Sequence, residues 1–475
     1  MSNRIVLIFL FSFLLHGLLI AQDSTFIYSI DLRGSISSNN QTPFWLRANS
    51  NGSTPDEGSF LSGSWGIHKI YHPHNPRFVK WAAGINLVTN LTRKTDVFFT
   101  DLYGAVLVGP VELSVGNRPT IMGLGDSTLS MGSVAMSQNF RPYPKIELST
   151  PHYINLIPGH DFLSFKFNYS DGLLGGAAVA YGRVDYVPNI YMHQKSLYIK
   201  LGGRNNTLNL YGGFNHQAIW GGENKIFTGG LDPWLAYKYV VIGKPWAYSR
   251  VGNHFGSIDL GMIVKGKKWN FFMYRQSIYE DGSLANLSNI ADGLNGLRIS
   301  RKHQNSNKNT FEVKSLLLEF LYTKNQGGSV FDFDKGIFGR DNYFNHYVYP
   351  QGWSYRGRGL GTPMIDSKRY LDSNLASSNS DFTNNNRIAA VHLGLAGSLR
   401  RIDFTLKSTF SQNEGTFGTT FEEKIYQTSL FLKVDHKLGA KAKSKLTFSF
   451  AGDFGKLYSQ NRAFTIGFTR SGFMN

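Results

Sequence analysis

The sequence predicts an all-β transmembrane protein: a closed antiparallel outer-membrane β-barrel of about 18 strands. Its extracellular loops are long enough to plug the lumen. Composition supports this prediction, because only 17% of the 475 residues are charged, 14% are aromatic and 51 are glycines. Two patterns add to it. Apolar and polar residues alternate along segments of about ten residues, the length that a tilted strand needs to cross a bilayer, and the connections between segments alternate between short and long.

The first residues read as an export signal. Arg4 provides a positive charge, an apolar run follows it, and Ala21 precedes a plausible cleavage point. The apolar run is short for a membrane span, so a retained anchor is the weaker alternative. We therefore expect a signal peptide over 1–22, a barrel domain over 23–475, and export to the outer membrane.

The strands are predicted from period-two alternation. Residues 163–169 alternate large apolar side chains with Ser, Lys and Asn, and residues 402–407 alternate them with Asp, Thr and Lys. Charge on the polar face suits a hydrated lumen better than the packed core of a soluble sandwich. The predicted strands are 25–36, 58–71, 80–91, 96–109, 111–116, 162–170, 173–186, 195–203, 206–217, 255–265, 268–279, 294–301, 310–323, 387–398, 401–411, 424–436, 444–454 and 462–473.

The connections predict which ends of the strands face the periplasm. Tight turns are predicted after even-numbered strands, at 109–110, 170–172, 203–205, 266–267 and 399–400. Long loops are predicted after odd-numbered strands, at 37–57, 117–161, 218–254, 280–293 and 324–386. Short periplasmic turns and long outer loops are typical of outer-membrane barrels, which places both chain ends in the periplasm. Residues 236–242 also look strand-like, but counting them as a span would break this rhythm, so we predict a loop there.

Charge and cysteine content limit the partners. The 49 Lys and Arg residues exceed the 32 Asp and Glu residues by 17, which favours anionic partners such as lipid phosphates or acidic polysaccharide. The basic residues are scattered and form no long run, so nucleic acid is not an expected partner. The chain has no cysteine, which excludes disulfides, thiolate catalysis, Cys-ligated zinc and lipoprotein acylation. We expect no cofactor and no metal.

The segment GGFNHQAIWGGE, at 212–223, is the densest cluster of reactive side-chain types. His216 and Glu223 are a potential base and acid, and Trp220 is a potential stacking platform. No serine stands nearby as a nucleophile, and the chain contains no Gly-x-Ser-x-Gly motif. A place at the barrel rim, or contact with a polar ligand, is therefore favoured over esterase activity.

The segment 340–363 interleaves aromatic residues with Asn, Asp, His and Arg. Aromatic faces stack on the C–H faces of sugars, and polar side chains bind hydroxyls, so this mixture suits a carbohydrate surface. The alternative is that the aromatic residues form an interfacial girdle and the loop packs on itself as a plug; both can hold. The candidate polysaccharide contacts are Tyr343, His346, Trp353 and Arg356, with Trp220 and Glu223 nearby.

Other clusters of titratable residues are interpreted as structural. Glu280 and Asp281 are adjacent, as are Glu422 and Glu423, and neighbouring strand residues point to opposite faces. Neither pair therefore forms a glycosidase dyad, and we interpret them as solvated loop charges. The histidines of 68–74 lie at a proline-containing turn without a nearby carboxylate, which favours a turn cluster over a metal site.

Several long segments resemble the Wzi-like capsule assembly family, in the form seen in Bacteroidetes-type bacteria. They are TPFWLRANSNGSTP (42–55), RPYPKIELSTP (141–151), HQKSLYIKLG (193–202), LYGGFNHQAIWGGE (210–223) and DNYFNHYVYPQGWSYRGRGLGTP (341–363). The resemblance covers nearly the whole mature chain. It implies an 18-stranded barrel that acts as a lectin-like surface anchor for capsular polysaccharide, and it transfers no catalytic residues. The best-known members block the barrel with a helical bundle, whereas here a plug would have to come from 117–161, 218–254 or 324–386.

The predicted function is non-catalytic anchoring or assembly of capsular or surface polysaccharide at the cell surface. The expected partners are that polysaccharide, outer-membrane lipid and lipopolysaccharide, and the barrel assembly machinery during biogenesis. One alternative is a porin or polysaccharide export channel, which the charged lumen faces favour. A second alternative is an outer-membrane hydrolase, which would need a nucleophile or a carboxylate pair that converges in the folded loops.

Overall fold

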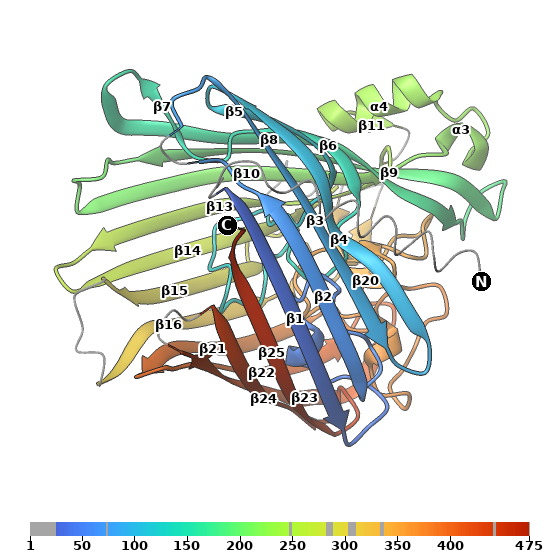
Figure 1. Cartoon of the computed structure of the whole chain (residues 1–475). Helices are drawn as coiled ribbons and strands as arrows, with labels where there is room; N and C mark the ends of the chain where they lie inside the picture. The colour runs from blue at the N-terminus through green and yellow to red at the C-terminus, as the bar shows by residue number, and fades with distance from the viewer. Residues whose placement is uncertain are drawn as a thin grey trace, which may run out of the picture.

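The computed structural model describes residues 25–474 except 73–74, 247–248, 282–287, 303–309, 333–336 and 440–442. The predicted signal peptide, 1–22, lies outside the described residues. The chain forms one closed antiparallel barrel (Figure 1). Closure is made by the first strand, β1 (Phe26–Ser37), which pairs with the last, β25 (Asn461–Phe473), so that Ile27 lies opposite Phe473.

The wall has 18 strand positions, as predicted. The strands β6 and β7 share one position, because both pair with successive parts of β8. The strands between β1 and β25 are β2 (Phe60–Lys69), β3 (Val79–Leu91), β4 (Thr95–Val108), β5 (Val111–Asn117), β6 (Pro144–Ser149), β7 (Ile154–Ile157), β8 (His160–Ala178), β9 (Tyr186–Leu201), β10 (Leu208–Trp220), β13 (Asn253–Lys265), β14 (Trp269–Glu280), β15 (Gly293–Arg301), β16 (Phe311–Tyr322), β21 (Ile388–Leu399), β22 (Ile402–Gly415), β23 (Thr420–Leu438) and β24 (Ser444–Gly455).

The outer face of the wall is apolar, because successive side chains of a strand point to opposite faces. On β9, Leu197 and Ile199 point outward and are 48% and 44% exposed, whereas Tyr198 between them points into the lumen and is buried. A closed sheet satisfies the backbone polar groups of every strand, which the interior of a bilayer requires. The chain is therefore an outer-membrane protein that crosses the bilayer with its wall strands. Within the described residues, no helix combines the length and the apolar character that crossing a membrane requires.

Two predictions around the sixth and seventh strands are wrong. One misses a strand and the other divides a single strand into two, so the predicted number of strands is still 18. The predicted loop 117–161 contains the wall position of β6 and β7, and the predicted turn 170–172 lies inside β8, a single strand of 19 residues. Gly172 suggested a turn, but its role is steric. A Cβ there would lie 2.5 Å from the ring of Tyr143, so the glycine lets this aromatic side chain pack against the wall.

Residues 236–242 form neither a strand nor an irregular loop, but most of helix α4 (Pro233–Ile242). The Asp232 carboxylate accepts hydrogen bonds from the backbone N–H groups of Trp234 and Leu235, both at 3.1 Å, which caps the helix. Gly243 ends it in a left-handed conformation, with φ +69°. The helix lies outside the barrel, beside the wall (Figure 1).

The longest connections all lie at the end of the barrel opposite the start of β1 and the end of β25, as the predicted loop rhythm requires. They are 38–59, 118–143, 221–252 and 323–387. The short elements that they carry are α2 (Phe44–Arg47), α3 (Glu223–Ile226), β11 (Pro245–Trp246), β12 (Ser249–Arg250), β17 (Phe331–Asp332), β18 (Ile337–Phe338), β19 (Ser354–Tyr355), β20 (Arg358–Gly359) and the 3-10 helix η1 (Lys368–Tyr370).

Candidate functional site

Three of the four long connections fold into the lumen and pack together as a plug. We use this name for 38–59, 118–143 and 323–387. The sequence pointed to 117–161, 218–254 and 324–386 as possible sources of a plug, but not to 38–59. The second of these was wrong, because 221–252 lies against the outside of the wall. The fully buried side chains of the plug include Phe44, Leu129, Met131, Met136, Tyr343, Phe344 and Trp353. They form one hydrophobic core with inward-facing side chains of the wall, so a packed protein interior fills this part of the lumen.

Polar groups of the wall bind the plug from the sides. The Glu319 carboxylate on β16 accepts hydrogen bonds from Ser130 Oγ at 2.6 Å and from the backbone N–H of Met131 at 2.7 Å. His392 Nε2 on β21 lies 2.7 Å from the Leu129 carbonyl oxygen. Buried backbone groups are costly when they lack a partner. These contacts therefore hold the connection 118–143 in one position inside the barrel.

The connections 118–143 and 323–387 also pack directly on each other. Trp353 Nε1 donates a hydrogen bond to the Ala135 carbonyl oxygen at 2.9 Å, and its ring lies 5.5 Å from that of Phe255 on the wall. A Cβ at Gly361 would collide with the backbone oxygen of Val134. The buried indole and the close backbone approach make the two connections one packed unit.

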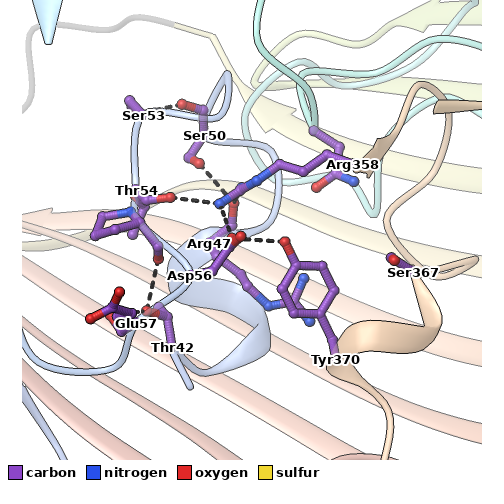
Figure 2. A network of polar contacts seen from close by, with 12 residues as sticks. Thr42, Arg47, Ser50, Ser53, Thr54, Asp56, Glu57, Arg358, Ser367 and Tyr370 are labelled. Carbon is purple, nitrogen blue, oxygen red and sulfur yellow. Dashed lines mark hydrogen bonds and ion pairs between the residues drawn. The ribbon is translucent and has the colours of Figure 1, made fainter. Parts of the chain in front are cut away.

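A polar network joins the connections 38–59 and 323–387 (Figure 2). Arg358 donates hydrogen bonds to the Asp56 carboxylate and to the Thr54 carbonyl oxygen, both at 2.6 Å, and Tyr370 OH donates to Asp56 at 2.7 Å. Burial opposes the ionisation of Asp56. The guanidinium groups of Arg358 and Arg369 and the Tyr370 hydroxyl outweigh it and hold the pKa of Asp56 below its usual value.

A second ion pair lies next to this network. Arg47 of α2 is 2.5 Å from Asp366, and both side chains are almost fully buried. The Arg47 guanidinium also stacks 3.7 Å from the centre of the Tyr370 ring. Burial opposes the charge on Arg47, but the carboxylate of Asp366 overcomes it and raises the pKa. The arginine therefore stays charged inside the plug and fixes α2 against η1.

The four candidate residues from 340–363 lie in the plug, and they differ in how far their side chains are exposed to solvent. Tyr343 and Trp353 are fully buried, and Tyr343 OH donates a hydrogen bond to Asp292 at 2.8 Å. His346 is half-buried, and its Nδ1 accepts hydrogen bonds from the next turn of the chain. Arg356 is exposed at the tip of the β19–β20 hairpin, with φ +50°. In this arrangement, Arg356 and part of His346 are open to a ligand.

Trp220 and Glu223 lie apart from these four residues, at the extracellular end of β10. The Trp220 ring is buried 5.6 Å from Tyr237 of α4, on the outer side of the wall. Glu223 is also buried, and its carboxylate accepts a hydrogen bond from the Gly221 N–H at 2.8 Å. Burial raises the pKa of Glu223. The structure thus does not gather the six candidate residues into one surface, and their contact with polysaccharide stays a prediction.

An extracellular groove that the sequence did not reveal lies at the rim of the barrel. Its volume is about 490 Å3, and we call it the rim groove. Its buried floor is Phe421, Ile425 and Tyr458. Its exposed polar residues are Asn374, Glu422, Glu423, Lys456 and Gln460.

The residues of the rim groove come from three separate segments. They belong to the loop that follows η1, the start of β23, and the end of β24 with the β24–β25 connection. Glu423 pairs with Lys456 across the groove at 2.6 Å. We interpreted Glu422 and Glu423 as solvated charges, and they are exposed. The same interpretation of Glu280 was wrong, because Glu280 is buried at the end of β14. Nothing in the sequence around them indicates a groove, because only the pairing of β23 with β24 brings its walls together.

A second cavity, of about 450 Å3, lies inside the barrel between the segment 118–125 and the inner face of β5–β9. Its lining includes Glu112, Arg118 and Lys166. Arg118 pairs with Glu112 at 2.6 Å. The cavity is thus lined by charges of both signs, as the charged polar faces of the strands predicted.

No family model and no curated protein matches this chain. Solved structures of similar barrels include OccAB4 of Acinetobacter baumannii, with TM-score 0.48 and 9% identity over 95% of this chain and 98% of the other. OccK5 (OpdH) of Pseudomonas aeruginosa gives TM-score 0.48 and 9% identity over 95% and 99%. The outer membrane protein opdK of Pseudomonas aeruginosa gives 0.45 and 9% over 94% and 98%. At these identities no residue role can be carried from one chain to another.

Proposed function

We propose that this protein is a non-catalytic outer-membrane barrel that binds surface polysaccharide at its extracellular rim. The observation that carries the proposal is the rim groove, which has an apolar floor and polar walls. The packed plug supports it, because a filled lumen suits surface binding better than transport. The resemblance of long sequence segments to the Wzi-like capsule assembly family points in the same direction.

The chemistry of the rim groove fits a chain of sugars. Phe421 and Tyr458 give the groove a buried apolar floor. The exposed carboxylates, amides and Lys456 ammonium along its walls can accept hydrogen bonds from sugar hydroxyls or donate to them. The charges of the groove refine the expected ligand. Glu422 and Glu423 outnumber Lys456, so the groove favours a neutral or amino-sugar-containing polysaccharide over an acidic one, although the whole chain is positive.

Binding of purified surface polysaccharide to the detergent-solubilised protein tests this proposal. The variant Glu422→Gln with Glu423→Gln keeps the size of both side chains and removes charge-assisted hydrogen bonds, each worth about 1.5–3 kcal/mol. We expect binding at least about tenfold weaker than that of the wild type. The control variant, Lys267→Gln with Lys268→Gln, changes two exposed residues at the opposite end of the barrel. Equal affinity of all three proteins would refute the rim groove as the binding site.

The second candidate function is that of a channel, and the charge-lined cavity beside 118–125 is the observation that favours it. A channel needs a continuous aqueous path past the plug. Single-channel recording in a planar bilayer separates the two functions. The plugged barrel that we propose gives no resolved conductance steps, whereas a channel gives steps of reproducible size.

A further inference from the structure

Polar side chains occupy the lipid-facing side of the wall near its extracellular end. On β9, His193 points outward like Leu197, yet it is fully buried. Its Nδ1 lies 2.9 Å from the carboxylate of Asp171 on β8. His216 and His254 share this outer face, with their ring nitrogens 2.8 Å apart. Carboxylate and imidazole groups that face acyl chains are costly, so this part of the wall requires a protein cover.

The connection 221–252 provides that cover by folding back over the outside of the wall (Figure 1). Tyr237 of α4 donates a hydrogen bond to Asp171 at 2.8 Å. Lys195 on the outer face of β9 donates to the carbonyl oxygen of Val241 near the end of the helix. The helix thus replaces lipid as the neighbour of the polar side chains, and it lies at the level of the outer leaflet.

A groove of about 720 Å3 remains between α4 and the wall. On the wall side it is lined by Val115, Ile146 and Leu173, and on the helix side by Trp234 and Tyr237. The three aliphatic side chains point outward, near the extracellular ends of their strands, and Ile146 is 58% exposed. The groove is therefore continuous with the apolar belt that contacts the bilayer, and an acyl chain is the natural occupant.

Basic and aromatic side chains lie on α4 and directly after it, and Trp234 among them lines the groove. Trp234 is 64% exposed, and Lys238 Nζ lies 5.1 Å from the centre of its ring. Lys244 Nζ lies 4.6 Å from the centre of the Tyr239 ring. Among the described residues, no carboxylate lies within ion-pair distance of either lysine. Indoles prefer the membrane interface, and lysines there reach the phosphates of lipid headgroups.

We propose that this groove is a binding site for a phosphorylated glycolipid of the outer leaflet, of the lipid A type. One acyl chain lies between α4 and the side chains of Val115, Ile146 and Leu173. Lys238 and Lys244 bind the headgroup phosphates. The site lies on the outer wall and is independent of the rim groove, so it stands or falls separately from the proposed polysaccharide binding.

Native mass spectrometry of the delipidated, detergent-solubilised protein tests this site. The protein is titrated separately with lipid A, phosphatidylglycerol and inorganic phosphate. We expect one saturable lipid A adduct, and adducts at least about tenfold weaker with the other two. The variant Lys238→Glu with Lys244→Glu repels the phosphates, and Leu173→Trp fills the groove. Each should weaken lipid A binding about tenfold or more.

The control for these variants is Lys267→Glu with Lys268→Glu, which reverses two exposed charges at the opposite end of the barrel. Heat-dependent migration in gel electrophoresis shows that each variant still forms a barrel. Unchanged lipid A binding in the Lys238 and Leu173 variants would overturn the site. Equal binding of phosphatidylglycerol would overturn its assignment to a glycolipid, and loss of binding in the control would show an effect of net charge alone.

Discussion

Close packing inside the plug depends on single residues that leave room for no larger side chain. At Gly361, an added methyl group would overlap the backbone oxygen of Val134, and Ser137 Oγ already donates to the Gly361 carbonyl at 2.6 Å. The backbone cannot yield without breaking that hydrogen bond. The size of this one residue therefore sets how closely two connections of the plug approach.

We predict that Gly361→Ala loosens the plug. Overpacking of a filled interior costs about 1–3 kcal/mol. The expected result is faster proteolysis within 118–143 in the folded protein, with the barrel itself intact. Gly104→Ala is the matched control, because a Cβ at Gly104 meets no atom within 4 Å. Equal proteolysis of both variants and the wild type would contradict this packing.

His346 makes one turn of the plug sensitive to acid. Its Nδ1 accepts hydrogen bonds from the N–H groups of Val348 and Tyr349, at 3.2 and 3.3 Å. Burial, with a smaller effect of His254, lowers the pKa of His346 to about 3. Below the ordinary pKa of about 6.5, the unfolded segment takes up a proton that the folded one does not. Stability from this residue is therefore complete above pH 6.5 and is lost as the pH falls toward 3.

Amide hydrogen exchange checks this pH dependence. Between pH 6.5 and pH 5, the linkage amounts to about 2 kcal/mol, so exchange at Val348 and Tyr349, corrected for intrinsic rates, should accelerate as the pH falls. His346→Asn keeps a hydrogen-bond acceptor near the same place and does not titrate. It should remove most of this acceleration, and a pH profile equal to that of the wild type would exclude His346 as its source.

The burial of Tyr343 and Trp353 depends on contacts with distant segments, which the sequence around them does not indicate. Tyr343 and Trp353 occur among polar residues in a loop, a pattern that fits a sugar-binding surface and a plug equally well. The Trp353 indole donates its hydrogen bond to Ala135, which precedes it by 218 residues and lies in a segment with no recognisable pattern. The sequence therefore predicted the plug as an alternative for this segment, but not which aromatic side chains it would bury.

At the scale of elements, ion pairs decide how the connections of the plug join. The connection 38–59 has little secondary structure of its own besides α2, and Arg358 holds it from the hairpin of β19 and β20. This arginine binds the Asp56 carboxylate and the carbonyl oxygens of Arg47 and Thr54. The guanidinium of Arg358 thus donates hydrogen bonds to three oxygen atoms of 38–59 and ties this connection to the β19–β20 hairpin.

We predict that Arg358→Ala releases the connection 38–59 and leaves the wall in place. The loss of these hydrogen bonds should cost about 2–3 kcal/mol, moderated because Asp56 is partly exposed and keeps its pairing with Arg369 at 2.8 Å. Limited proteolysis should then cut within 38–59. Arg356→Ala removes an exposed arginine from the same hairpin. This variant should be cleaved within 38–59 no faster than the wild type. Similar cleavage of the two variants would contradict the role of Arg358.

Strand prediction succeeded where alternation was long and failed where the plug meets the wall. The six residues of β6 alternate, but they are few and follow a long irregular connection, so they were not recognised as a strand. In β8, Gly172 imitates a turn because Tyr143 needs its space. Helix α4 was missed for another reason: only its capping residues distinguish it from an apolar strand, since it is apolar on most sides.

At the scale of the whole molecule, the length of the loops and the number of strands determine what the barrel can do. The alternation and the loop rhythm were sufficient to predict a closed barrel of 18 strands. Neither pattern could locate the rim groove, because its walls meet only after β23, β24 and β25 have paired. The net charge of +17 is not spread evenly, since the exposed rim groove is acidic while exposed lysines lie on and after α4.

The plug should be what closes the lumen. We predict that replacing 340–363 with a short Gly/Ser linker opens an ion-conducting path, because this segment supplies Tyr343, Phe344 and Trp353 to the buried core. In planar bilayers the variant should show conductance steps that the wild type lacks. A silent variant that is folded would mean that the rest of the plug is sufficient to block the barrel, and a conducting wild type would favour the channel.

Polysaccharide binding at the rim groove is best decided in cells of the source organism. The measurement is the ratio of surface-retained to shed polysaccharide in cells that lack the gene and in cells complemented with the wild type, with Glu422→Gln and Glu423→Gln together, or with Lys267→Gln and Lys268→Gln together. We predict that deletion and the rim-groove variant both shed polysaccharide at unchanged total synthesis, and that the wild type and the control variant retain it. Full retention in the deletion strain would contradict the anchoring function, and full retention with the rim-groove variant alone would contradict its site.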